Sequence, residues 1–92
     1  MTTESAEVVD RAVVLAYVRE QIAKHLDVDV AEVPEDAPVY ALPEIDSLKA
    51  MRAVTEVEKR FGITAPVGEI IVVRTVGEVA DLVLAAIEEN RA

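Results

Sequence analysis

Three stretches of the chain space their hydrophobic residues three and four positions apart, which is the spacing of one face of a helix. In the first stretch, from Val8 to about Leu26, Val14, Val18 and Ile22 recur at four-residue intervals. No glycine or proline interrupts this stretch. The pattern therefore predicts a first long helix with a buried aliphatic stripe.

A second helix is predicted to begin near Asp46 or Ser47 and to end at Gly62, because glycine commonly stops a helix. Lys59 and Arg60 fall in its last turn, where positive charge complements the helix dipole. The hydrophobic residues expected on its buried stripe are Leu48, Met51, Val54, Val57 and Phe61.

A third long helix is predicted to begin at Thr75, which can cap it together with Glu78 in a capping box. Its expected buried stripe consists of Val76, Val79, Ala80, Val83 and Ile87. The segment "ITAPVGEIIVVR", residues 63–74, is ambiguous, because "IIVV" alone is typical of a strand. A single strand would have no partner in a helical chain, so a short irregular helix is predicted here.

A long loop is predicted between the first two helices. Residues 27–44 contain three prolines and several acidic residues, both typical of a loop. Val28 and Val33 are expected to contact the core and hold the loop against it. A loop of this length is often functional.

The composition supports an all-α fold. Hydrophobic residues make up 52% of the chain, aromatic residues 3%, and there are only three glycines, so the core is expected to be aliphatic and helical. The 92 residues suit one domain. We predict a bundle of three long helices and one short helix over residues 8–89, between a flexible N-terminal tail (1–7) and a C-terminal tail (90–92). The length suggests a discrete monomeric protein.

The charge and the hydrophobic runs restrict the possible partners. A net charge of −9 is a poor match for nucleic acid or an anionic membrane surface, since binding to phosphates requires positive charge. The longest apolar run, "AVVLAYV", is far shorter than the ~20 residues of a membrane helix. The polar, acidic N-terminus does not resemble a secretory signal. With no cysteine, the chain is consistent with the cytoplasm, which is the expected location.

The residues needed for catalysis are scarce. His25 is the only histidine and there is no cysteine, so neither a catalytic triad nor a zinc site can be assembled. The acidic residues of the loop do not have the spacing of a calcium site. We therefore expect no catalytic residue, no metal site and no enzymatic activity. Ser47, in "DSL" at residues 46–48, is either a helix cap or an attachment site, and the tripeptide alone favours the cap.

Several short motifs, taken in order, resemble the acyl carrier protein family, which includes peptidyl carrier domains. "DSL" stands at the position of the family's modified serine, and "EVEKRFGI", residues 56–63, is similar to the end of the family's second helix. Pro66 lies where the family often has a proline before its third helix. "RTVGEVADLV", residues 74–83, is similar to the start of the last helix. The resemblance extends from about Val8 to Ile87.

The resemblance implies a carrier-protein bundle in which Ser47 holds a 4′-phosphopantetheine arm. The arm would carry an acyl or aminoacyl group as a thioester, with the thiol supplied by the arm because the chain has no cysteine. Asp46 and Leu48 would complete the attachment site, with Asp46 positioning the serine region. The implied partners are a phosphopantetheinyl transferase, an acyltransferase or an acyl- or aminoacyl-loading enzyme, and synthase enzymes. A helix N-terminus suits the attachment, since its free N–H groups favour a phosphate.

The loop before Asp46 departs from the family pattern. The family usually has a glycine two residues before the aspartate, where this chain has Glu44. Pro43 replaces the leucine that normally precedes that glycine, and Leu42 is expected to fill the same space.

The second helix also suggests a partner surface and a cargo cleft. Lys49 and Arg52 lie off the hydrophobic stripe and are expected to be exposed, whereas fatty-acid carriers usually present an acidic second helix. The resemblance therefore implies a specialised pathway, such as polyketide or antibiotic biosynthesis, rather than housekeeping fatty-acid synthesis. A possible acyl cleft between this helix and residues 63–74 would be lined by Met51, Val54, Ile70, Ile71 and Val73.

Other functions remain open at this stage. The chain could be an unmodified helical protein–protein interaction module in which Ser47 is only a cap, or a carrier for fatty-acid synthesis. Filling of the core alone would equally explain the residues of the proposed cleft. A DNA-binding helical domain is disfavoured, because no helix has a basic face.

Overall fold

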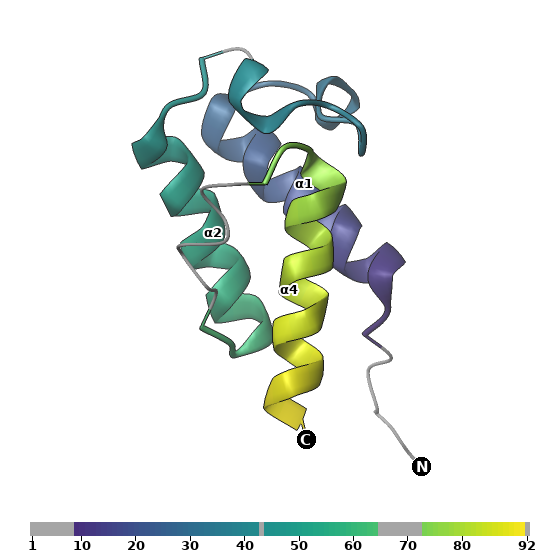
Figure 1. The fold of residues 1–92 in the computed structure, drawn as a ribbon. Helices are drawn as coiled ribbons and strands as arrows, with labels where there is room; N and C mark the ends of the chain where they lie inside the picture. Colours follow the sequence, from purple (N-terminus) through teal and green to yellow (C-terminus); the bar gives the residue numbers. More distant parts are fainter. Residues whose placement is uncertain (1–8, 43, 65–72, 92) are drawn as a thin grey trace.

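The computed structural model describes residues 9–42, 44–64 and 73–91, with side chains described to residue 89. Three helices form the bundle: α1 (Arg11–Leu26), α2 (Ser47–Phe61) and α4 (Val76–Arg91). Two short 3-10 helices, η1 (Val30–Glu32) and η2 (Val39–Ala41), lie in the connection between α1 and α2. Figure 1 shows this connection crossing one end of the bundle, with α1 packed against both α2 and α4.

Helix α1 begins at Arg11, later than the predicted start at Val8. Asp10 is the N-cap, and its carboxylate accepts a hydrogen bond from the Val13 backbone N–H at 3.0 Å. An N-cap residue has non-helical backbone angles, so Val9 and Asp10 lie outside the helix. The predicted stripe is confirmed, because Val14, Val18, Ile22 and Leu26 are all buried.

Helices α2 and α4 begin at the predicted capping residues. Helix α2 ends at Gly62, which adopts the left-handed conformation expected of a C-terminal glycine. At the start of α4, the hydroxyl of Thr75 accepts a hydrogen bond from the Glu78 N–H at 3.2 Å. The Glu78 carboxylate accepts from the N–H of Arg74, one residue before the position that the capping box predicted. Helix α4 continues to Arg91 and so includes two of the three residues expected in the C-terminal tail.

The predicted long loop is fixed to both α1 and α4. The Arg19 guanidinium donates to the carbonyl oxygens of Val33, at 2.7 Å, and Val30, at 3.1 Å. Val33 is fully buried, as predicted, whereas Val28 is only half-buried. Backbone hydrogen bonds join residues 35–39 to residues 74–77, around an isolated antiparallel bridge between Pro38 and Thr75.

Ion pairs also join the loop to α1 and α4. Arg11 of α1 bonds Glu35 of the loop and Asp81 of α4, each at 2.6 Å. These hydrogen bonds, that to Asp81 first, raise the pKa of Arg11. Gly77 allows this close approach, because a β-carbon there would lie 2.8 Å from the Glu35 Cγ atom.

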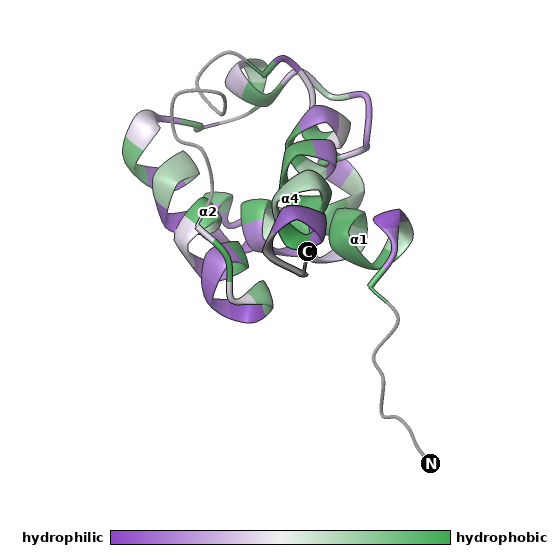
Figure 2. Ribbon diagram, turned by 60° about the horizontal axis from the view of Figure 1, so that its bottom comes forward, coloured by the Kyte–Doolittle hydropathy of each residue, from purple (hydrophilic) through white to green (hydrophobic). Residues whose placement is uncertain are grey.

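The core is aliphatic, as the composition predicted. Figure 2 shows hydrophobic residues concentrated where the helices approach one another. Most buried hydrophobic residues belong to α1, α2, α4 and the loop: Val14, Val18, Ile22, Ala23, Leu26, Val33, Ala37, Val39, Leu42, Ala53, Val54, Val57, Val76, Val79, Ala80, Val83 and Ile87. Tyr17 and Phe61 meet edge to face with their ring centroids 5.7 Å apart, at the junction of α1 and α2.

The prediction of an all-α bundle is confirmed over the described residues, where all regular elements are helical. The predicted short fourth helix falls mainly on residues 65–72, which lie outside the described residues. None of the described helices is long and apolar enough to span a membrane.

Candidate attachment site and cavity

Ser47 is the first residue of α2, and the residue before it caps the helix. The Asp46 carboxylate accepts a hydrogen bond from the Lys49 backbone N–H at 2.8 Å, and Asp46 has the extended backbone of an N-cap. The Asp46 carbonyl also accepts from the N–H of Ala50, which begins the helical hydrogen bonding. Asp46 therefore caps α2, and Ser47 is not the cap that the sequence alone allowed it to be.

The Ser47 side chain is exposed and not needed for capping. The first backbone N–H groups of a helix have no partner within the helix, and they lie at the positive end of its dipole. A phosphate attached to the hydroxyl oxygen of Ser47 would lie close to this end of α2. The residues present thus fit a serine that carries a phosphodiester.

The backbone at Glu44 adopts the conformation that a glycine would adopt most easily. Its φ of 63° lies in the left-handed region, where a β-carbon is unfavourable. Lys49 reaches back to this residue, and its ammonium donates to the Glu44 carbonyl oxygen at 3.0 Å. Leu42 is buried, as expected from its proposed replacement of the family's leucine. The loop therefore keeps a turn before Asp46 although Glu44 occupies the position of the family's glycine.

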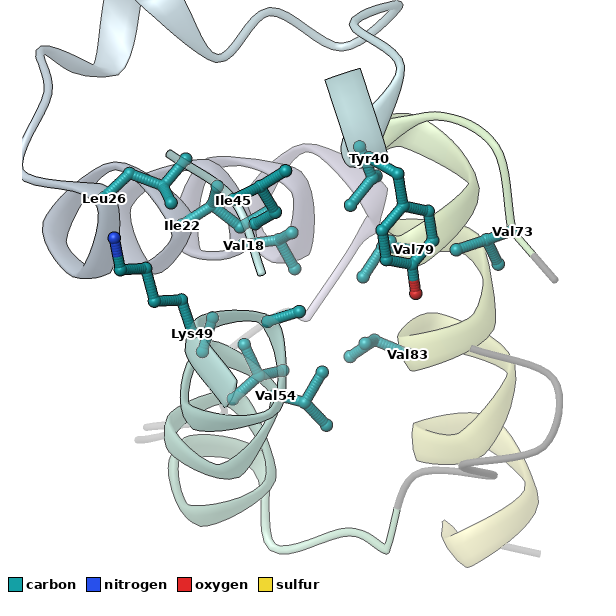
Figure 3. A pocket seen from close by; sticks show the side chains of 14 residues that line it. Val18, Ile22, Leu26, Tyr40, Ile45, Lys49, Val54, Val73, Val79 and Val83 are labelled. Atoms are coloured by element: carbon teal, nitrogen blue, oxygen red, sulfur yellow. The ribbon is translucent and has the colours of Figure 1, made fainter. Parts of the chain in front are cut away.

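An apolar cavity lies between α1, α2, α4 and η2. Its volume is about 30 Å³, enough for one or two water-sized groups. Aliphatic side chains form most of its wall, as Figure 3 shows, with Val18 and Ile22 from α1, Val54 from α2 and Val83 from α4. The remaining lining residues are Leu26, Val39, Tyr40, Ile45, Lys49, Ala50, Ala53, Val57, Val73 and Val79.

Only some of the residues predicted to line the cleft lie at the cavity. Val54 and Val73 line the cavity, whereas Met51 is half-buried and does not belong to its lining. Ile70 and Ile71 lie outside the described residues. Tyr40 and Ile45, which come from the loop, also line the cavity, and the sequence pattern did not predict this. Their position could not be read from a periodic pattern, because neither belongs to a long helix.

Two residues that follow Ser47, Leu48 and Lys49, differ in their exposure from the prediction. Leu48 was predicted on the buried stripe, but 60% of it is exposed, so that prediction is wrong. Leu48 lies in the first turn of α2, beyond the region where α2 packs on the core. Lys49 was predicted to be exposed but is half-buried, because its side chain lies along the cavity and bonds Glu44. Arg52 is exposed, as predicted.

Comparison with known proteins agrees with this geometry. A family model described as "Phosphopantetheine attachment site" matches residues 16–83, which include α2 and most of the bundle. The chain is also similar to "Polyketide-8 synthase acyl carrier protein 2" from Streptomyces avermitilis. The two are 30% identical over 73 residues, which cover 79% of this chain and 84% of the relative. The carrier role is not catalytic and implies contact with synthase and modifying enzymes. The chain therefore belongs to the acyl carrier protein family, whose cofactor is a covalently attached 4′-phosphopantetheine.

Proposed function

We propose that Ser47 is the attachment point of the 4′-phosphopantetheine arm and that the protein carries acyl groups for a polyketide-like biosynthetic pathway. The observation that carries this proposal is the division of roles at the start of α2. Asp46 caps the helix, and Ser47 presents an exposed hydroxyl beside it. The only other serine, Ser5, lies in the expected N-terminal tail, outside the described residues.

The modification is a transfer from coenzyme A by a magnesium-dependent phosphopantetheinyl transferase. The Ser47 hydroxyl oxygen forms a new bond to the phosphorus of the phosphopantetheine group and loses its proton. The pyrophosphate bond of coenzyme A breaks, and adenosine 3′,5′-bisphosphate leaves. When bound, the arm supplies the thiol on which an acyl group is held as a thioester. Asp46 fixes the first turn of α2, and with it the position of the serine that the transferase must reach.

The assignment to a polyketide-like pathway has two supports. The first is the relative from Streptomyces avermitilis, which is an acyl carrier protein of a polyketide synthase. The second is the charge near the attachment site, where Arg52 is exposed in the second turn of α2 in a chain of net charge −9. A partner with acidic or apolar residues around its active-site entrance would match this surface, whereas a partner with a basic entrance would not.

The attachment site is tested by mass spectrometry. Wild type, Ser47→Ala and Ser5→Ala are incubated with coenzyme A, magnesium and a broad-range phosphopantetheinyl transferase. We expect wild type and Ser5→Ala to gain the mass of one phosphopantetheine and Ser47→Ala to gain none. A gain by Ser47→Ala would place the attachment elsewhere. No gain by wild type would favour an unmodified interaction module.

The pathway is tested with the modified protein. Loading is measured with an acyltransferase of a polyketide synthase and with the corresponding enzyme of fatty-acid synthesis. We expect the polyketide enzyme to load the arm with the higher kcat/KM. A preference for the fatty-acid enzyme would assign the protein to fatty-acid synthesis and leave the attachment at Ser47 unaffected.

A further inference from the structure

We propose that Lys49 is a positioning residue for the modification of Ser47. Its side chain holds the left-handed turn at Glu44 and so keeps the serine where the phosphopantetheinyl transferase can reach it. The inference rests on the proposed function, because it concerns how the attachment point is presented. It gives Lys49 a role within the chain, in place of the exposed partner contact that the sequence suggested.

The first step is that the residues at the very start of α2 do not fix their own position. The Ser47 side chain is exposed and does not cap the helix. The next side chain, Leu48, is 60% exposed and is not part of the core. The position of Ser47 must therefore be set by the residues on either side of it.

The second step is that Lys49 bonds two residues that precede the serine. Its backbone N–H donates to the Asp46 carboxylate at 2.8 Å, and its ammonium donates to the Glu44 carbonyl oxygen at 3.0 Å. Ser47 lies between these residues in the chain, so each bond closes a ring that contains it. Each ring restricts the backbone of the residues that it encloses.

The third step is that the turn at Glu44 needs such a contact. Its φ of 63° is unfavourable for a residue with a β-carbon, so the turn opens more easily than one built on glycine. The next residue, Ile45, donates from its N–H to the Leu42 carbonyl oxygen at 3.3 Å, longer than a typical hydrogen bond. The shorter bond from the charged ammonium is the stronger of the two contacts.

The fourth step is that the stem of Lys49 is already directed by packing. Lys49 is half-buried and lines the apolar cavity. In Figure 3 its side chain extends from α2 toward Leu26 of α1. A lysine can pack its methylene groups on apolar side chains while its charge stays at a polar position. Less side-chain freedom is therefore lost when the bond to Glu44 forms than at a fully exposed lysine.

The test is a double-mutant cycle on Lys49 and Glu44. Lys49→Met keeps an apolar stem and removes the donor, whereas Glu44→Gly removes the penalty for the left-handed turn. Wild type, the two single variants and the double variant are modified with coenzyme A, magnesium and a broad-range transferase, and kcat/KM is measured by mass. Lys24→Met is the matched control, because it removes the same charge from an exposed position in α1.

Lys49→Met should lower kcat/KM about threefold to tenfold, the effect of one hydrogen bond. In the Glu44→Gly background the same substitution should lower it less than about twofold, because glycine keeps the turn without the bond. Lys24→Met should stay within about twofold of wild type. An equal fall in both backgrounds would mean that the transferase contacts the ammonium itself, and it would overturn the proposal. No fall for Lys49→Met, or an equal fall for Lys24→Met, would also overturn it.

A second measurement does not depend on the transferase. Amide hydrogen exchange of Ile45 in the unmodified protein reports on opening of the turn, because its N–H bonds Leu42. Lys49→Met should speed this exchange about threefold to tenfold, and Lys24→Met should leave it within about twofold. Unchanged exchange in Lys49→Met would overturn the proposal. Failure of wild type to gain the mass of the arm would instead overturn the proposed function.

Discussion

The Lys49 ammonium lies 3.0 Å from the carbonyl oxygen of Glu44, so the first turns of α2 hold the end of the loop that precedes the helix. Glu44 has a φ of 63°, a conformation that costs a residue with a β-carbon about 1–2 kcal/mol. The side chain of Lys49 also forms part of the cavity wall. This contact therefore links three features: the turn before Ser47, the start of α2 and the wall of the cavity.

Glu44→Gly is expected to stabilise the protein by about 0.5–1 kcal/mol. Glycine adopts the left-handed conformation without strain, although its greater freedom in the unfolded chain offsets part of the gain. The midpoint of thermal unfolding should rise by roughly 2–8 °C. Glu44→Ala keeps the β-carbon and should give no gain. If both variants unfold at the temperature of wild type, the left-handed turn does not limit stability.

Two variants, Asp46→Ala and Asp46→Asn, distinguish the role of Asp46 as a helix cap from the role of its negative charge. Alanine removes the acceptor for the Lys49 N–H and should cost about 1 kcal/mol, whereas asparagine caps about as well as aspartate. Circular dichroism during thermal unfolding measures both effects. If Asp46 acts by positioning Ser47, the transferase should modify Asp46→Asn at close to the wild-type rate and Asp46→Ala more slowly. Equal slowing of both variants would show that the transferase recognises the carboxylate itself.

Leu48→Ala should leave stability within about 0.5 kcal/mol, because 60% of Leu48 is exposed and surface substitutions have small effects. Val54→Ala, a buried residue of the same helix, should cost more, about 1–3 kcal/mol. Denaturant unfolding gives both free energies. We also expect Leu48→Ala to slow modification of Ser47 at unchanged stability, since an exposed leucine beside the attachment site is available to a partner enzyme. Wild-type rates for Leu48→Ala would remove it from the partner surface.

The helices could be predicted because their hydrophobic periods are regular and their end signals are local. The stripe of α1 and the end of α2 at Gly62 followed from spacing and from one glycine. The start of α1 was placed too early, because Val8 and Val9 extend the apolar pattern past the Asp10 cap. Periodicity assigns a residue to a face of a helix. It does not show how far along the helix the packing against the core extends. That limit explains the wrong prediction for Leu48.

Features that depend on contacts between distant residues could not be predicted. Arg11 pairs with Glu35 and Asp81 across three elements, and nothing local to any of them indicates the others. The same holds for Tyr40, whose place at the cavity follows from the packing of the loop against residues 74–77. The attachment site was predictable to a greater extent, because an aspartate cap and the serine after it are adjacent in the chain.

The last prediction concerns the charge of the partner surface. Lys49 and Arg52 were expected to act together, but the Lys49 ammonium already bonds Glu44, which leaves Arg52 as the more available charge. Arg52→Glu should therefore slow loading by the cognate acyltransferase about fivefold at low salt, the effect of turning a surface attraction of less than 1 kcal/mol into a repulsion. The loss should appear mainly in the association rate and shrink as salt is added.

Lys24→Glu is the matched control, because it changes the net charge by the same amount from an exposed position in the last turn of α1. If the effect of Arg52 is local, Lys24→Glu should load at close to the wild-type rate. An enzyme of fatty-acid synthesis with a basic entrance should use Arg52→Glu as well as, or better than, wild type, because the substitution replaces a positive charge on α2 with a negative one. If Arg52→Glu and Lys24→Glu slow the cognate enzyme equally, only the total charge matters. The basic start of α2 would then carry no information about the partner, and the pathway would have to be assigned from the cargo alone.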